Sequence, residues 1–286
     1  MNKVLNQQTL HILRKAIGNE SYLFQSKIMF SSLIYLKNGN LEDSYIIKKT
    51  TNTPKFLEDW IIYLTMRSTA RSFLTTGKMI RDEKDVDTYS NLDFYGYDDL
   101  ERLFFAQTQE TDEKKAKNVF ILSKSTTLDD IFQLNFFKED FAIKYVMLNE
   151  KDRSLALEDE SAKKYFDAYN IRIIKEDKIA CVNDAFMYMK KNIEFSSPIL
   201  FEIGPTTLME YMDELKPEQD EEGFIDFVLV SAYTGYLSED CIGPRFPSVD
   251  KLTSGMKLVN VSQEIPSENG MLKFYTFIRE RKGVEI

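Results

Sequence analysis

ILFEIGPTTLMEYM, at residues 199–212, is the stretch that decides the fold. An apolar run ends at Glu202, a Gly-Pro-Thr corner follows, and Leu208, Tyr211 and Met212 then share one face of a helical repeat. The pattern predicts a buried parallel strand, a tight turn and a helix with a proline in its first turn. The first amides of a helix have no partner within it, and such helix starts commonly bind nucleotide phosphates. We therefore expect an anion site at this turn.

Strands and helices alternate along most of the chain. Short apolar runs predict strands at residues 27–35, 72–75, 118–123, 141–148, 171–174 and 197–202, with helical segments between them. After these, the pattern changes to three strands without a long helix between them, at 224–233, 256–264 and 271–279, and Asn269-Gly270 marks a hairpin turn. We predict an α/β fold with a mainly parallel sheet, helices on both of its faces and an antiparallel C-terminal hairpin.

The composition excludes several classes of function. The chain has 286 residues, 43% hydrophobic and 29% charged, and its net charge of -9 argues against a general nucleic-acid binder. No apolar run reaches the roughly 18 residues that a membrane-spanning helix needs. His11 is the only histidine, and Cys181 and Cys241 are the only cysteines. We therefore expect no metal site, no histidine-based triad and no disulfide framework.

The N-terminus has the pattern of a docking helix. Residues 1–26 are predicted to form this extension and residues 27–286 the α/β domain. Leu5, Leu10 and Leu13 fall on one face together with Ile17, and leaving such a face in water is unfavourable. We expect this face to dock either on the chain's own domain or on a protein partner, in a larger assembly or a homo-oligomer, and we favour the partner. We do not expect this segment to be a cleaved targeting peptide. Because both cysteines look like core residues, we expect the protein in an intracellular, reducing compartment, either cytoplasmic or mitochondrial.

Several segments resemble the reductase domain of the riboflavin pathway, a relative of dihydrofolate reductase. Residues 199–208 resemble its E-G-G-P-T-L turn and the elements around it, and residues 73–83 resemble its I-L-V-G-A-G-T-V-R-A-D-D segment. Residues 27–39 are similar to the family's first strand and the S-L-D-G turn after it. Residues 64–71 are similar to one of its helices, and residues 243–247 to its late glycine-rich loop. The resemblance covers about residues 27–282. It implies a dihydrofolate reductase-like fold, an NADPH cofactor and a pterin- or pyrimidine-like substrate.

The resemblance also implies two groups of site residues. The positions that match the family's cofactor turns are Thr76, Gly77, Lys78, Glu202, Ile203, Gly204, Pro205, Thr206 and Thr207. The positions that match its substrate-binding segments are Asn38, Arg81 and Asp82. No residue is identified as catalytic and none as a metal ligand.

The chain departs from the family where the chemistry takes place. Lys78 and Ile203 replace glycines of the two cofactor turns, and residues 83–85 replace the D-D-P element. Glycine lets a cofactor approach the backbone, whereas a branched side chain occupies that space and resists unusual backbone angles. We therefore expect vestigial turns that mainly shape the fold, no tight NADPH binding, and most simply no cofactor.

Three functions are compatible with these features. The first is a non-catalytic pseudoenzyme that acts as an accessory or structural subunit of a protein complex. The alternative is an NADPH-dependent reductase of a pterin- or pyrimidine-like substrate, in which the cofactor supplies the hydride. The residues to suspect would then be Glu202, Asn38, Lys78 and Arg81. A nucleotide-binding regulatory module without turnover lies between the two.

Overall fold

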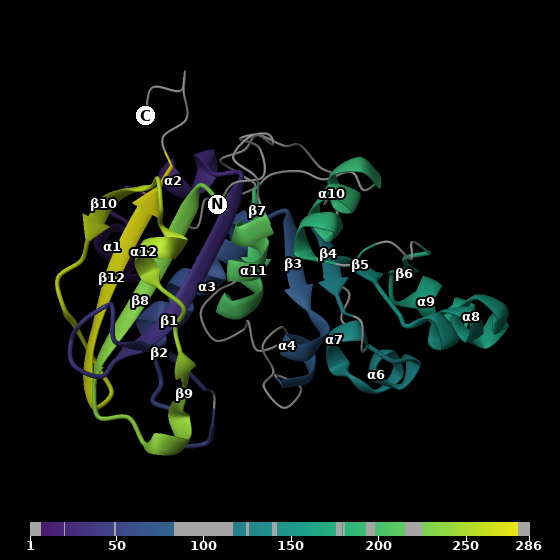
Figure 1. Cartoon of the computed structure of the whole chain (residues 1–286), viewed down its shortest axis with the longest axis horizontal. Helices are drawn as coiled ribbons and strands as arrows, with labels where there is room; N and C mark the ends of the chain where they lie inside the picture. Colours follow the sequence, from purple (N-terminus) through teal and green to yellow (C-terminus); the bar gives the residue numbers. More distant parts are fainter. Residues whose placement is uncertain are drawn as a thin grey trace. The chain divides into compact units, whose positions relative to one another are not determined.

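The chain forms two compact units (Figure 1). Unit 1 consists of residues 1–69 and 215–286, and unit 2 of residues 70–214. The structure, a computed structural model, describes residues 7–19, 21–48, 50–82, 117–123, 126–138, 142–175, 179, 181–192, 198–214 and 225–279. None of the helices in these ranges is long and apolar enough to span a bilayer.

Unit 2 is built on a parallel sheet in which neighbouring strands follow the order β7-β3-β4-β5-β6. These strands are β3 (Ser72–Thr76), β4 (Lys117–Leu122), β5 (Ala142–Val146), β6 (Ile171–Ile173) and β7 (Ile199–Glu202). Their apolar sequences are those of strands covered on both faces, and every residue of β7 is buried.

Helices follow these strands in the chain. They are α4 (Gly77–Asp82), α6 (Leu128–Gln133), α7 (Asn135–Lys138), α8 (Glu150–Glu158), α9 (Glu160–Ala168), α10 (Val182–Asn192) and α11 (Pro205–Glu214). Because the strands are parallel, the turns β7–α11, β3–α4, β4–α6 and β5–α8 lie side by side along one edge of the sheet. We call this edge the carboxyl edge of unit 2. In open α/β sheets, ligands generally bind beyond the carboxyl ends of the strands.

Unit 1 combines parallel and antiparallel pairs. β1 (Ile28–Leu36) runs parallel to β8 (Phe227–Gly235), and β12 (Gly270–Ile278) runs antiparallel to β8. The other strands are β2 (Ser44–Ile47), β9 (Ile242–Arg245), β10 (Lys257–Val261) and β11 (Ile265–Ser267). The helices are α1 (Gln7–Ile17), α2 (Ser21–Gln25), α3 (Leu57–Thr69), the 3-10 turn η3 (Glu239–Cys241) and α12 (Val249–Leu252).

The antiparallel hairpin predicted at the C-terminus is confirmed. β10 and β11 both pair antiparallel with β12, and Ser267 pairs with Gly270 across a two-residue loop. Asn269 in that loop has a φ of 59°, a left-handed conformation that asparagine adopts more readily than most residues. The Asn-Gly signal therefore locates the turn, although Gly270 is already the first residue of β12.

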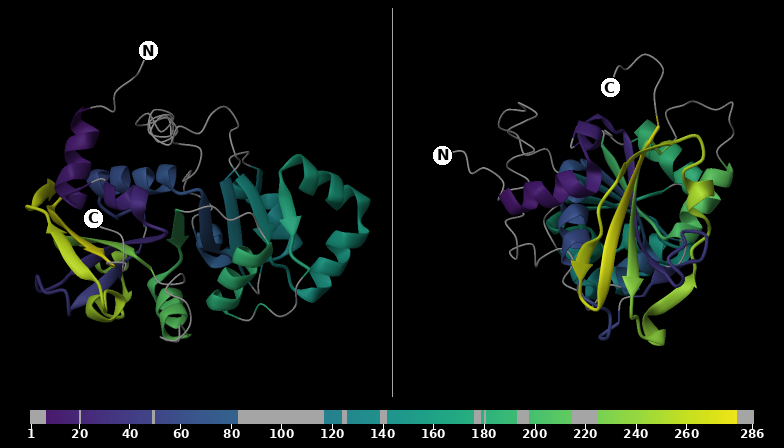
Figure 2. Two further views of the ribbon diagram at one scale, coloured as in Figure 1. Left: turned by 90° about the horizontal axis from the view of Figure 1, so that it is seen from above. Right: turned by 90° about the vertical axis from the view of Figure 1, so that its left-hand side faces the viewer.

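Helix α1 packs on its own unit, where we expected a partner. Leu13, Ala16 and Ile17 are buried, the last two completely, and α1 contacts β12 and α3 (Figure 2). The Ala16 carbonyl at the end of the helix accepts hydrogen bonds from Thr276 Oγ1 (2.9 Å) and Asn260 Nδ2 (2.8 Å). Leu5 and the side chain of Leu10 lie outside the described part of the chain.

The predicted fold class is confirmed as a mixed α/β fold with a mainly parallel sheet. One local prediction changes, because Thr76-Gly77-Lys78 does not form a separate turn after β3. Helix α4 begins directly at Gly77. The division of the chain at residue 26 stays a prediction.

Candidate functional site

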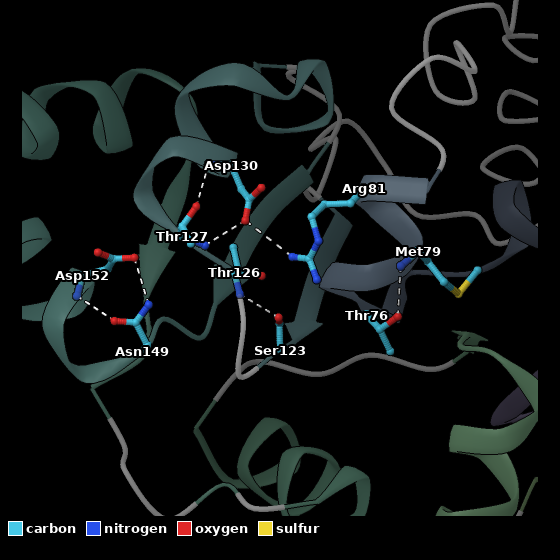
Figure 3. Close-up of polar contacts among 9 residues, drawn as sticks. All are labelled: Thr76, Met79, Arg81, Ser123, Thr126, Thr127, Asp130, Asn149 and Asp152. Carbon is cyan, nitrogen blue, oxygen red and sulfur yellow. Dashed lines mark hydrogen bonds and ion pairs between the residues drawn. The ribbon is translucent and has the colours of Figure 1, made fainter.

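The junction of β3 and α4, at Thr76 and Gly77, packs against the turn between β4 and α6. Thr76 ends β3, and its Oγ1 accepts a hydrogen bond from the Met79 N–H (3.3 Å) (Figure 3). A Cβ on Gly77 would lie 2.4 Å from Thr126 Oγ1 and 2.6 Å from Ser123 Oγ. Glycine is therefore needed here so that two turns of the protein can approach each other.

The turn between β4 and α6 is ordered by side-chain hydrogen bonds. Ser123 Oγ accepts the Thr126 N–H (2.9 Å), and Thr127 forms a capping box with Asp130 at the start of α6. The side chain of Thr126 is almost fully buried, and its hydroxyl has no hydrogen-bond partner among the described residues. A buried hydroxyl without a partner is unfavourable, so this turn carries a local cost in stability.

An ion pair links α4 to the first turn of α6. Arg81 Nη1 lies 3.5 Å from Asp130 Oδ2, and both side chains are partly exposed, at 31% and 20% (Figure 3). The same carboxylate oxygen accepts the Thr127 N–H at 2.9 Å. The carboxylate of Asp130 is thus held in a fixed place at the rim of the edge.

The turn between β7 and α11 is the open part of the edge. Glu202 and Ile203 are buried, at 5% and 3% exposure, whereas Gly204 is partly exposed. Apart from its chain neighbours Ile203 and Pro205, no described residue has an atom within 4 Å of a Cβ placed on Gly204. Pro205 opens α11 and Thr206 is exposed, so the first amides of this ten-residue helix begin next to open space.

The structure brings most of the predicted cofactor residues to one edge. Thr75 and Glu202 are partners in the pairing of β3 with β7, so the turns that follow them lie side by side. Lys78 is exposed in the first turn of α4. Which of these residues contact a cofactor stays a prediction.

The predicted substrate residues are divided between the two units. Arg81 pairs with Asp130 in unit 2, and Asp82 is the last residue of α4. Asn38 lies in unit 1, where its Nδ2 donates to Asp43 Oδ2. Residues 83–85, which match the family's D-D-P element, lie outside the described residues.

Sequence reasoning missed the group formed by Ser123, Thr126, Thr127 and Asp130. The signal was present, because Thr127 and Asp130 have the spacing of a capping box directly after a buried strand. What the sequence does not show is that this turn packs on Gly77, which is 46 or more residues earlier in the chain.

Other chemistry is limited in the described part of the chain. No group of three or more acidic, cysteine or histidine side chains there could hold a metal ion. Burial and a hydrogen bond to Glu214 raise the pKa of the Cys181 thiol to about 11, so it is protonated and a poor nucleophile at neutral pH. Cys241 is buried. The described edge therefore offers binding and positioning groups, with no activated thiol.

Comparisons by sequence find no relatives, since no protein-family model and no curated protein matches the chain. Comparisons of the structure with solved structures do find similar proteins. A crystal structure of a pyrimidine reductase-like protein from Corynebacterium diphtheriae matches with a TM-score of 0.55 at 15% identity, over 96% of this chain and 99% of that one.

Two longer proteins match more weakly. They are a diaminohydroxyphosphoribosylaminopyrimidine deaminase/5-amino-6-(5-phosphoribosylamino)uracil reductase from Thermotoga maritima (TM-score 0.47, 14% identity, 89% of this chain and 56% of that one) and RibD from Acinetobacter baumannii (TM-score 0.45, 10% identity, 90% and 59%). This chain spans just over half the length of each. The first match shows that this chain shares the fold of that pyrimidine reductase-like protein, and the resemblance seen in the sequence is confirmed at the level of the fold alone.

Proposed function

We propose that the chain binds a nicotinamide dinucleotide on the carboxyl edge of unit 2 and acts as a reductase of a pterin- or pyrimidine-like substrate. The observation that carries the proposal is the open space beside Gly204 at the start of α11. A dinucleotide needs one helix start at which its pyrophosphate can approach the backbone closely, and this turn has that form.

The residues present at this turn are compatible with a dinucleotide. The branched side chain of Ile203, which we expected to obstruct the approach, is 97% covered by protein and so does not project into solvent at this turn. The amides of Thr206 and Thr207 would bind the pyrophosphate, because Gly204 has no side chain to cap the helix and Pro205 has no N–H. The bound cofactor supplies a hydride.

The non-catalytic accessory role remains the second candidate, and one observation favours it. Ser123 and Thr126 fill the space next to Gly77, so the first turn is used for packing within the protein. If the second turn served packing in the same way, the edge would have no place for a cofactor. The space beside Gly204 is therefore the feature that separates the two functions.

The test is to titrate the full chain with reduced nicotinamide dinucleotides and follow the nicotinamide fluorescence. Gly204→Val should abolish binding with little loss of stability, because no described residue other than its two chain neighbours comes within 4 Å of a Cβ at this position. Glu210→Ala, on the exposed side of the same helix, is the matched control and should bind like the unchanged chain.

Consumption of the reduced cofactor with aminopyrimidine and pterin substrates then tests catalysis. Cofactor binding without consumption for any of these substrates would reduce the proposal to a nucleotide-binding module. No binding by the folded chain would refute it and favour the accessory role.

A further inference from the structure

Strand β10 forms an outer edge of unit 1 and carries exposed apolar side chains. Among the described strands it pairs only with β12, on the side of β12 that faces away from β8 (Figure 1). Leu258 and Val261 of this strand are 47% and 43% exposed. The outer side of an edge strand presents backbone N–H and C=O groups that can pair with a strand of another chain.

A β-bulge turns these two side chains to the same face of the sheet. Leu258 lies opposite Phe277 and Val261 lies opposite Tyr275, and the register shifts between the two pairs. Phe277 and Tyr275 are two residues apart on β12 and therefore share a face. Without the shift, Leu258 and Val261 would point to opposite faces. The bulge therefore gathers the exposed apolar side chains of the edge on one face.

The opposite face of the same edge is covered by helix α1. Asn260 pairs with Thr276, and both side chains donate hydrogen bonds to the Ala16 carbonyl at the end of α1. Because side chains alternate along a strand, Asn260 points away from the face of Leu258 and Val261. Helix α1 thus holds β10 in place from one face and leaves the apolar side chains on the other.

The charges along this edge suit pairing with a second copy of the chain. Lys257 begins β10, Glu264 follows its end, and both are exposed. When two copies of the edge run antiparallel, the start of each lies at the end of the other, so Lys257 of each copy comes close to Glu264 of the second. Opposite charges across paired strands are favourable, whereas a parallel arrangement would bring like charges together. Antiparallel pairing is also what a two-fold axis produces, with one surface serving both copies.

We propose that the chain forms a two-fold dimer through antiparallel pairing of the β10 edges. Leu258 and Val261 are buried between the two copies, and Lys257 lies next to Glu264 of the second copy at each end. The inference is independent of the proposed function, because β10 belongs to unit 1 and the turn at Gly204 belongs to unit 2.

The first test is sedimentation equilibrium of the full chain, which should show a dimer at micromolar concentrations. Leu258→Lys should raise the dissociation constant of the dimer about tenfold or more, because a charge then replaces an apolar contact. Leu155→Lys is the matched control, since Leu155 on α8 is 49% exposed, and it should leave the dimer unchanged. Urea unfolding of both variants checks that they are folded.

The second test exchanges the charges between copies. Lys257→Glu and Glu264→Lys should each weaken the dimer, because like charges then meet at both ends. An equimolar mixture of the two variants should associate as well as the unchanged chain, because every pair in the mixed dimer is again of opposite charge. The inference is overturned if the unchanged chain is a monomer at about 100 μM, which would leave the edge to a different protein. Association that survives Leu258→Lys, or a mixture as weak as the single variants, would overturn it as well.

Discussion

Replacing Gly77 with alanine tests how the two turns of the edge pack together. The added Cβ would lie 2.4 Å from Thr126 Oγ1, 2.6 Å from Ser123 Oγ and 2.8 Å from Ser123 Cβ, all closer than real Cβ contacts. Overpacking of this kind costs about 1–3 kcal/mol. Alanine regains about 0.5–1 kcal/mol in a helix because it loses less backbone entropy than glycine. We therefore expect a net loss between about 0 and 2.5 kcal/mol in the free energy of unfolding, centred on about 1 kcal/mol.

The assay is urea unfolding, read as a lower midpoint with an unchanged slope. Gly204→Ala is the matched control, and it should stay within about 0.5 kcal/mol of the unchanged chain because no described residue other than its chain neighbours is near its Cβ. Adding Thr126→Ala to Gly77→Ala should restore part of the loss, since it removes the atom with the closest contact. The packing argument is refuted if Gly77→Ala is as stable as the unchanged chain, or if Gly204→Ala loses as much.

Three further changes test other parts of the structure. Ile17→Ala should lower the free energy of unfolding by about 2–5 kcal/mol because Ile17 is fully buried, and unchanged urea unfolding would mean that α1 does not pack on unit 1. Thr127→Ala should cost about 1 kcal/mol through loss of the cap of α6, and Thr127→Ser should restore most of it. Burial raises the pKa of Cys181 to about 11, so its alkylation, followed by mass spectrometry of its peptide, should be slow at neutral pH and accelerate about tenfold per pH unit towards that value. A plateau near the ordinary pKa of 9.0 would contradict the buried environment.

The fold was accessible from the sequence because its signals are local. The run of apolar residues that ends at Glu202, and the Gly-Pro corner after it, identify a buried strand and a helix start without knowledge of any neighbour. Asn269 likewise locates the hairpin because few other residues adopt its backbone conformation so readily.

The packing of the site could not be predicted from the sequence, because it depends on contacts between residues that are far apart along the chain. From the sequence, Gly77 looks like a turn residue, because glycine weakens helices. In the structure it is the first residue of α4, and it is glycine because Ser123 and Thr126 leave no room for a side chain. The burial of Ile203 is also a tertiary property, which the sequence alone could not show. The cover of α1 by β12 could not be told from cover by a partner for the same reason.

The most direct test of the account is a calorimetric titration of NADH into the full chain and into Gly204→Val. The account predicts a dissociation constant in the micromolar range for the unchanged chain, equivalent to about -8 kcal/mol, and no measurable binding by an equally stable Gly204→Val. Absence of binding by the unchanged chain, or equal binding by both proteins, would contradict the claim that the turn beside Gly204 holds a dinucleotide.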